Sequence, residues 1–195
     1  MLGYSAWPSV PATPASSFST RAEATSASGC CTRRTSPSRG YRVLALSFRG
    51  YGSSHAPSRV LGHLDRDVSA GIAALKRDGA DRIVAVGASM GGTAAIVAAA
   101  TLQPTPAAIV SLSAPRIFGE LDAARTIGSL RVPALFVAAR ADGQAAEEAA
   151  LMYRKTKVRG KRLLIVPGGS HGVSLLGSGP PRVRNVVAEL IRKHG

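Results

Sequence analysis

The amino-acid sequence predicts an α/β fold built on a doubly wound, mostly parallel sheet. Short apolar runs typical of strands alternate with longer segments that carry apolar residues at helical spacing, and this alternation is typical of βαβ units. The apolar run at 82–87 has the continuous character of a strand buried on both faces. The length of 195 residues is enough for one domain with a substantial core.

Five strands and four helices are expected in alternation from residue 40 onward. The strands are expected at 41–48, 82–87, 107–112, 132–138 and 162–166, and the helices at 62–77, 90–102, 144–155 and 183–193. Apolar residues lie on one face of the first helix, namely Leu64, Val68, Ile72 and Leu75. That helix is expected to end at Gly79.

Residues 1–39 differ in composition from the core that we expect at 40–195. Ser, Thr, Ala and Pro dominate them, and no helical or alternating apolar pattern persists, so we expect a low-complexity segment that is disordered or non-native. The uncharged start and the prolines at 8 and 11 argue against a secretory signal. No run reaches the about 18 apolar residues of a membrane-spanning helix. We therefore expect a cytoplasmic protein without a membrane partner.

The chain is strongly basic, with a formal net charge of +14. The densest cluster of positive charge comprises Arg154, Lys155, Lys157, Arg159, Lys161 and Arg162. Such a cluster can bind phosphates, but more often it is a solvated helix end and the loop after it. Nucleic-acid binding is therefore not expected as the main function.

The two cysteines exclude two classes of small protein. Cys30 and Cys31 are adjacent, so the chain has neither a disulfide framework nor the paired spacing of a structural zinc site. We expect no metal and no organic cofactor.

The strongest chemical motif is Gly87-Ala88-Ser89-Met90-Gly91-Gly92, between an expected strand and an expected helix. A serine hydroxyl becomes a nucleophile when a tight turn exposes it beside a base, and small neighbours allow such a turn. The backbone N–H of Met90 would then point at a developing oxyanion. The alternative is a glycine-rich turn that only starts a helix.

Two later loops, each just after an expected strand, supply a carboxylate and a histidine. Asp142 can orient a histidine, or it can cap the helix that follows, or both. His171 lies among glycines and is well placed as a general base. The other histidines are less well placed: His55 in a loop, His63 at a helix start and His194 in the tail. The order Ser89, Asp142, His171 is that of α/β-hydrolases.

From residue 40 to its end, the chain resembles serine hydrolases of the α/β-hydrolase fold, in particular lidless esterases and dienelactone-hydrolase-like enzymes. The resemblance rests on the Phe48-Arg49-Gly50-Tyr51-Gly52-Ser53 loop, the serine motif, Asp142-Gly143 and Gly169-Ser170-His171-Gly172. It implies that Ser89 is the nucleophile, His171 the base, Asp142 its orienting acid and Met90 an oxyanion-hole donor. Ser47 stands where the family often has Asp.

The resemblance also implies that part of the family's fold is missing from this chain. The strand at 41–48 corresponds to the fourth of eight in the family order 1-2-4-3-5-6-7-8. The fold is therefore expected to lack its N-terminal strands, including the third, whose loop supplies the second oxyanion-hole donor. An atypical N-terminus, or one that results from a shifted reading frame, would explain the abrupt change in composition.

The function expected is that of a serine hydrolase acting on small acyl esters or related carbonyl compounds through an acyl-enzyme. Only about twenty residues separate Leu112 from Val132, too few for a lid domain, which favours small substrates by analogy with the fold. Two alternatives remain: an inactive, truncated hydrolase-like domain, and a basic protein that binds anions or nucleic acid. The oligomeric state is not predicted.

Overall fold

A seven-stranded, mostly parallel sheet forms the centre of the protein. The computed structural model describes residues 17–20, 31–36, 41–51, 54 and 62–195. The order across the sheet is β2-β3-β1-β4-β5-β8-β9, and only β2 runs antiparallel to its neighbour. The strands are β1 (Ser17–Thr20), β2 (Cys31–Ser36), β3 (Tyr41–Leu46), β4 (Val84–Ala88), β5 (Ala108–Leu112), β8 (Ala134–Ala139) and β9 (Lys161–Val166).

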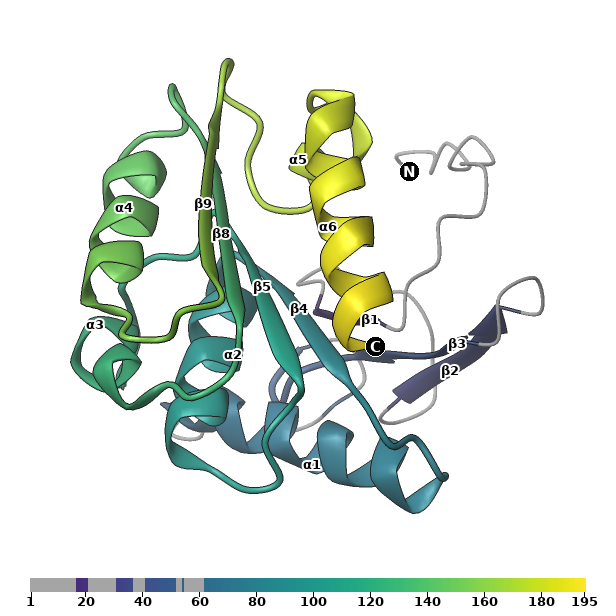
Figure 1. Cartoon of the computed structure of the whole chain (residues 1–195). Helices are drawn as coiled ribbons and strands as arrows, with labels where there is room; N and C mark the ends of the chain where they lie inside the picture. The colour runs from purple at the N-terminus through teal and green to yellow at the C-terminus, as the bar shows by residue number, and fades with distance from the viewer. Residues whose placement is uncertain (1–16, 21–30, 37–40, 52–53, 55–61) are drawn as a thin grey trace, which may run out of the picture.

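Helices cover both faces of this sheet (Figure 1). The longer helices are α1 (Leu64–Arg77), α2 (Met90–Thr101), α4 (Ala145–Lys155) and α6 (Pro181–His194). Residues of α1, α2 and α4 pack with one face, whereas residues of α6 pack with the other. No helix in the described ranges is long and apolar enough to cross a membrane.

Small elements lie between the major ones. The segment between β5 and β8 contains the two-stranded hairpin β6 (Ile117–Phe118) and β7 (Leu121–Asp122), the short helix α3 (Ala123–Thr126) and the 3-10 turn η2 (Ile127–Ser129). The short helix α5 (Ser174–Gly177) precedes α6.

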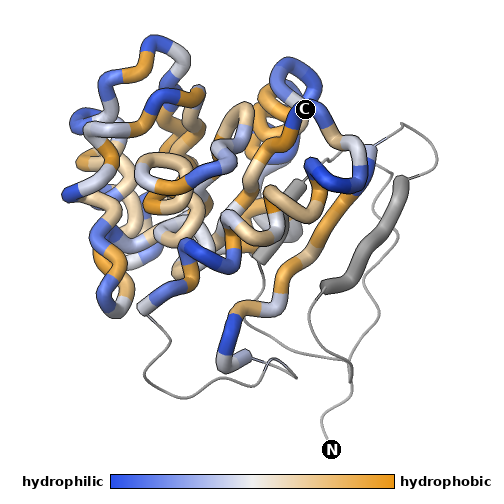
Figure 2. Tube along the Cα trace, turned by 90° about the horizontal axis from the view of Figure 1, so that it is seen from below, coloured by the Kyte–Doolittle hydropathy of each residue, from blue (hydrophilic) through white to orange (hydrophobic). Residues whose placement is uncertain are grey.

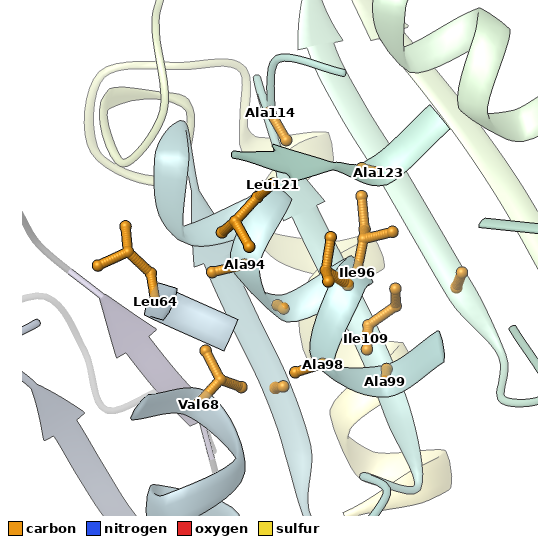
Figure 3. Packing of buried hydrophobic residues seen from close by; sticks show 14 of the residues in the cluster. Leu64, Val68, Ala94, Ile96, Ala98, Ala99, Ile109, Ala114, Leu121 and Ala123 are labelled. Atoms are coloured by element: carbon orange, nitrogen blue, oxygen red, sulfur yellow. The ribbon is translucent and has the colours of Figure 1, made fainter. Parts of the chain in front are cut away.

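The buried helix α2 packs closely because its side chains are small. Ten of its residues are buried, from Met90 to Ala99. Leu64 and Val68 of α1 lie beside alanines of α2 (Figure 3). Alternate residues of each inner strand point to the two faces, so Val84 and Val86 join the α6 side and Ala85 the α2 side. This burial on both faces is why the strand at 82–87 has no polar alternation.

The fold class and the elements expected from residue 40 onward are confirmed. Each of the five expected strands and four expected helices is present, with ends that differ by one or two residues. Leu64, Val68, Ile72 and Leu75 are all buried on α1, as their spacing predicts.

The expectation of an empty position in the sheet is wrong. Strand β1 lies between β3 and β4 and pairs in parallel with both, at the place that the family order gives to strand three. Strand β2 pairs along the outer edge of β3. Both strands come from residues 1–39. A short segment such as β1 can fill the central position because the neighbouring strands already offer partners for its backbone hydrogen bonds. The division at residue 40 and the shifted reading frame stay predictions.

Candidate active site

Ser89 lies in the sharp turn that joins β4 to α2. Its backbone has φ 51° and ψ −126°, a conformation that a residue with a side chain rarely adopts. Such strain persists only where the surrounding structure enforces it, and it is concentrated at functional sites. The observed strand, strained serine and helix match the turn that the sequence predicts.

Two glycines allow the strand and the helix to approach closely at this turn. A Cβ atom on Gly87 would overlap the Gly91 carbonyl group and lie 2.6 Å from Gly92 N. A Cβ atom on Gly92 would lie 2.7 Å from the Cβ of Ala114. Real Cβ atoms do not come this near to other heavy atoms, so the need for small residues here is confirmed for both positions.

The end of β5 braces the serine turn from one side. Ser89 N donates to Leu112 O at 2.8 Å, and Ser113 N donates to Val137 O on β8 at 2.8 Å. Ser113 also has a positive φ, of 50°. On α2, the buried Thr93 Oγ1 donates to Pro115 O at 2.6 Å. These bonds tie the serine turn and the start of α2 to the end of β5, and the end of β5 to β8.

Asp142 and His171 come together although 29 positions separate them in the chain. His171 Nδ1 lies 2.9 Å from each carboxylate oxygen of Asp142. The Asp142 side chain is 12% exposed, whereas that of His171 is 54% exposed. When Nδ1–H donates to the carboxylate, Nε2 is the ring nitrogen that can accept a proton.

The alternative role of Asp142 as a helix cap is not what the structure shows. Helix α4 has Gln144 at its N-cap, with no side-chain capping bond. The Asp142 backbone carbonyl accepts from Ala145 N at 2.9 Å, while its carboxylate is hydrogen-bonded to His171.

The loops that carry the acid and the histidine are tied to each other and lie beside the serine turn. Ala141 N donates to Gly168 O at 2.9 Å, which joins the two loops. A Cβ atom on Gly172, next to His171, would lie 3.5 Å from the Cβ of Ala88, next to Ser89. Within the described residues, however, no hydrogen bond joins the Ser89 hydroxyl to His171.

Met90 is the first residue of α2, so its backbone N–H has no partner within the helix. It therefore remains free to donate to an anion at the helix N-terminus, where the helix dipole also favours negative charge. The loop after β1, at 21–30, lies outside the described residues, as does His55.

Sequence reasoning missed one pair beside this edge of the sheet. Arg49, in the loop after β3, donates from Nε and Nη2 to Asp67 Oδ1 at 2.9 and 2.6 Å, and its backbone N donates to Oδ2 at 2.9 Å. The hydrogen bond to Asp67 raises the pKa of Arg49 above its usual value. No periodic pattern links residues 18 positions apart, so only the fold reveals this pair.

The family of the alpha/beta hydrolase fold matches residues 30–155, which is more than half of the chain. The chain belongs to this family. The matched stretch contains Ser89 and Asp142, and His171 lies beyond it. No curated protein matches the chain in sequence.

Solved structures share the fold at low sequence identity. The Pyrococcus furiosus esterase Pf2001 is 22% identical, with a TM-score of 0.65 over 80% of this chain and 72% of that chain. The Paleococcus ferrophilus monoacylglycerol lipase is 15% identical, with a TM-score of 0.63 over 80% and 85%. MenH from S. aureus is 11% identical, with a TM-score of 0.64 over 80% and 85%. At these identities, the likeness shows the fold alone.

Proposed function

We propose that this protein is a serine hydrolase that cleaves small acyl esters or related carbonyl compounds. The observation that carries the proposal is the contact of His171 Nδ1 with Asp142, beside a serine held in a strained turn. An acid that fixes one ring nitrogen of a histidine leaves the other ready to act as a base. The family to which the chain belongs, and the esterases and lipases that share its fold, agree with this chemistry.

The reaction would proceed in two acyl transfers. Ser89 Oγ attacks the carbonyl carbon while His171 Nε2 accepts its proton, and Asp142 stabilises the imidazolium. The Met90 N–H donates to the oxyanion. His171 returns the proton to the departing alcohol, and a water molecule then hydrolyses the acyl-enzyme by the same steps. The hydrogen bond between Ser89 and His171 would form when substrate binds, because catalytic hydrogen bonds are often long or poorly aligned in free enzymes.

The segment between β5 and β8 favours small substrates. It consists of a two-stranded hairpin, a short helix and a 3-10 turn. Ile117 and Phe118 of the hairpin provide apolar surface next to the end of β5. We infer a small-molecule partner with a short acyl group. Cytoplasmic location stays a prediction.

A fluorophosphonate probe tests the proposal directly, because it labels only an activated serine. We expect labelling of the purified full-length chain and none of Ser89→Ala. Ser129→Ala serves as the matched control, since Ser129 is an exposed serine in η2, away from the triad. His171→Ala should also abolish labelling.

Absence of labelling in a folded protein would overturn the proposal in favour of an inactive hydrolase-like domain. Labelling that survives in Ser89→Ala would assign the reactivity to another residue. A screen of short-chain esters against the labelled protein would then define the acyl length.

A further inference from the structure

The edge of the sheet opposite Ser89 carries a strong excess of positive charge. At this edge the parallel strands begin and the long helices end, so residues that are distant in sequence gather there. We call these residues the amino-edge face. Among the residues that the structure describes, thirteen basic residues belong to it: Arg42, Lys76, Arg77, Arg82, Arg131, Arg154, Lys155, Lys157, Arg159, Lys161, Arg162, Arg192 and Lys193. Twelve of them are exposed. Figure 2 views the molecule from this side.

Few acidic residues in the described part of the chain offset this charge. Asp78 and Asp81 lie in the loop before β4. Glu189, about one turn before the end of α6, forms an ion pair with Arg162 at 3.0 Å. At the opposite edge, two arginines have acidic partners. Arg49 pairs with Asp67 and Arg116 with Glu148.

Helix dipoles explain only part of the excess. The last turns of α1, α4 and α6 are basic, which complements the negative end of each helix dipole. The other seven basic residues lie in loops or at strand starts, outside the last turns of these helices: Arg42, Arg82, Arg131, Lys157, Arg159, Lys161 and Arg162. Of these, Arg82 and Lys161 donate to carbonyl groups at the ends of α6 and α4.

Several of these side chains are held by carbonyl groups, which position a charge without cancelling it. Arg82 Nη2 donates to Lys193 O at 2.8 Å, and Lys161 Nζ donates to Thr156 O at 2.7 Å. Burial, followed by the charges of Lys193 and Arg82, lowers the pKa of His194 below its ordinary value.

A hollow of about 390 Å³ opens on the same face. Tyr41, Arg42, Asp81 and Arg82 are among its lining residues. It offers two guanidinium groups and one half-buried tyrosine ring at the start of two sheet strands. Arginine suits phosphate because its planar fork binds two oxygens at once.

We propose that the amino-edge face binds the phosphate backbone of nucleic acid, independently of the hydrolase site on the opposite edge. Arginines outnumber lysines on it eight to five, which favours phosphate groups. A membrane surface fits less well, because peripheral binding usually adds exposed apolar residues to basic ones. The exposed large apolar side chain found among the described residues is Ile117, which follows the carboxyl end of β5 instead.

Fluorescence polarisation of a fluorescein-labelled DNA duplex, titrated with the full-length chain at several salt concentrations, tests this proposal. The affinity should fall steeply with salt, with a logarithmic slope of about −0.9 for each phosphate contacted. The double variant Lys157→Gln/Arg159→Gln should bind several-fold more weakly and reduce the slope by about 1 for each lost contact.

The matched control is Arg66→Gln/Arg182→Gln, which removes the same charge from exposed residues at the opposite edge. It should bind the duplex as the unaltered chain does. Equal weakening by both double variants, or no binding even at low salt, would overturn the proposal. Binding to phosphatidylserine vesicles without binding to the duplex would overturn it in favour of a membrane surface.

Discussion

The backbone strain at Ser89 can be measured without any substrate. We compare Ser89→Gly with Ser89→Ala. Both substitutions remove the hydroxyl, but only alanine keeps the Cβ atom that makes φ 51° with ψ −126° unfavourable. The difference between the two variants therefore isolates the backbone strain from the loss of the side chain.

The expected magnitude follows from two opposing effects. A residue with a side chain is destabilised by about 1–3 kcal/mol in such a conformation, and glycine avoids most of this. Glycine also loses about 0.4–1 kcal/mol through the greater entropy of the unfolded chain. Ser89→Gly should therefore exceed Ser89→Ala in free energy of unfolding by about 1 kcal/mol, or about 2–4 °C in Tm for a chain of this size.

Urea-induced unfolding followed by circular dichroism measures this difference. The same pair of substitutions at Ser111 serves as control, because Ser111 lies in the regular strand β5, which neighbours β4. There, glycine should be less stable than alanine, by about 0.5–1 kcal/mol. If alanine is the more stable variant at both positions, the turn at Ser89 is not strained and the argument fails.

Three further predictions follow from other contacts. Asp142→Asn should lower kcat/KM for a short ester by about 10³–10⁴, because the amide stabilises the wrong tautomer of the histidine; an effect below tenfold would remove the acid from the mechanism. Gly87→Ala should cost about 1–3 kcal/mol by overlap with α2, whereas Gly128→Ala, with open space around it, should be neutral in the same urea titration. Because the folded pKa of His194 is lowered, the unfolded chain binds more protons, so the free energy of unfolding should fall as the pH drops from neutral toward about 5. His194→Gln should flatten this part of the pH profile, and an unchanged profile would assign the pH dependence to other groups.

The sequence predicted the major elements because their apolar patterns match their burial. The helix α1 is the clearest case, since its four spaced apolar residues all face the core. The two-residue strands β6 and β7 were not predicted, because two residues show no periodicity. Strands β1 and β2 were missed for a different reason. The segment Ser17–Thr20 has no apolar alternation and acquires its place from β3 and β4, whose edges supply its hydrogen bonds.

The sequence predicted three candidate residues and their order along the chain, and the structure brings two of them, Asp142 and His171, into contact. Each of the three candidate residues follows a strand, and the carboxyl ends of parallel strands share one edge of the sheet. The sequence did not reveal the hydrogen bonds and backbone conformations that hold the serine turn in place. The bond from Ser89 N to Leu112 O and the positive φ of Ser113 depend on the packing of strands that are distant in sequence.

The hydrogen bond from Ala141 N to Gly168 O has a consequence for protein engineering. Asp142 and His171 sit on two loops that are joined to each other, whereas Ser89 sits on a turn braced separately by β5. The two joined loops therefore form one structural unit that holds the acid and the base, and the serine turn forms a second unit. A chimaera that exchanges only one of the two joined loops should lose the contact between Asp142 and His171. A chimaera that transplants both loops together should keep this contact in another protein of this fold.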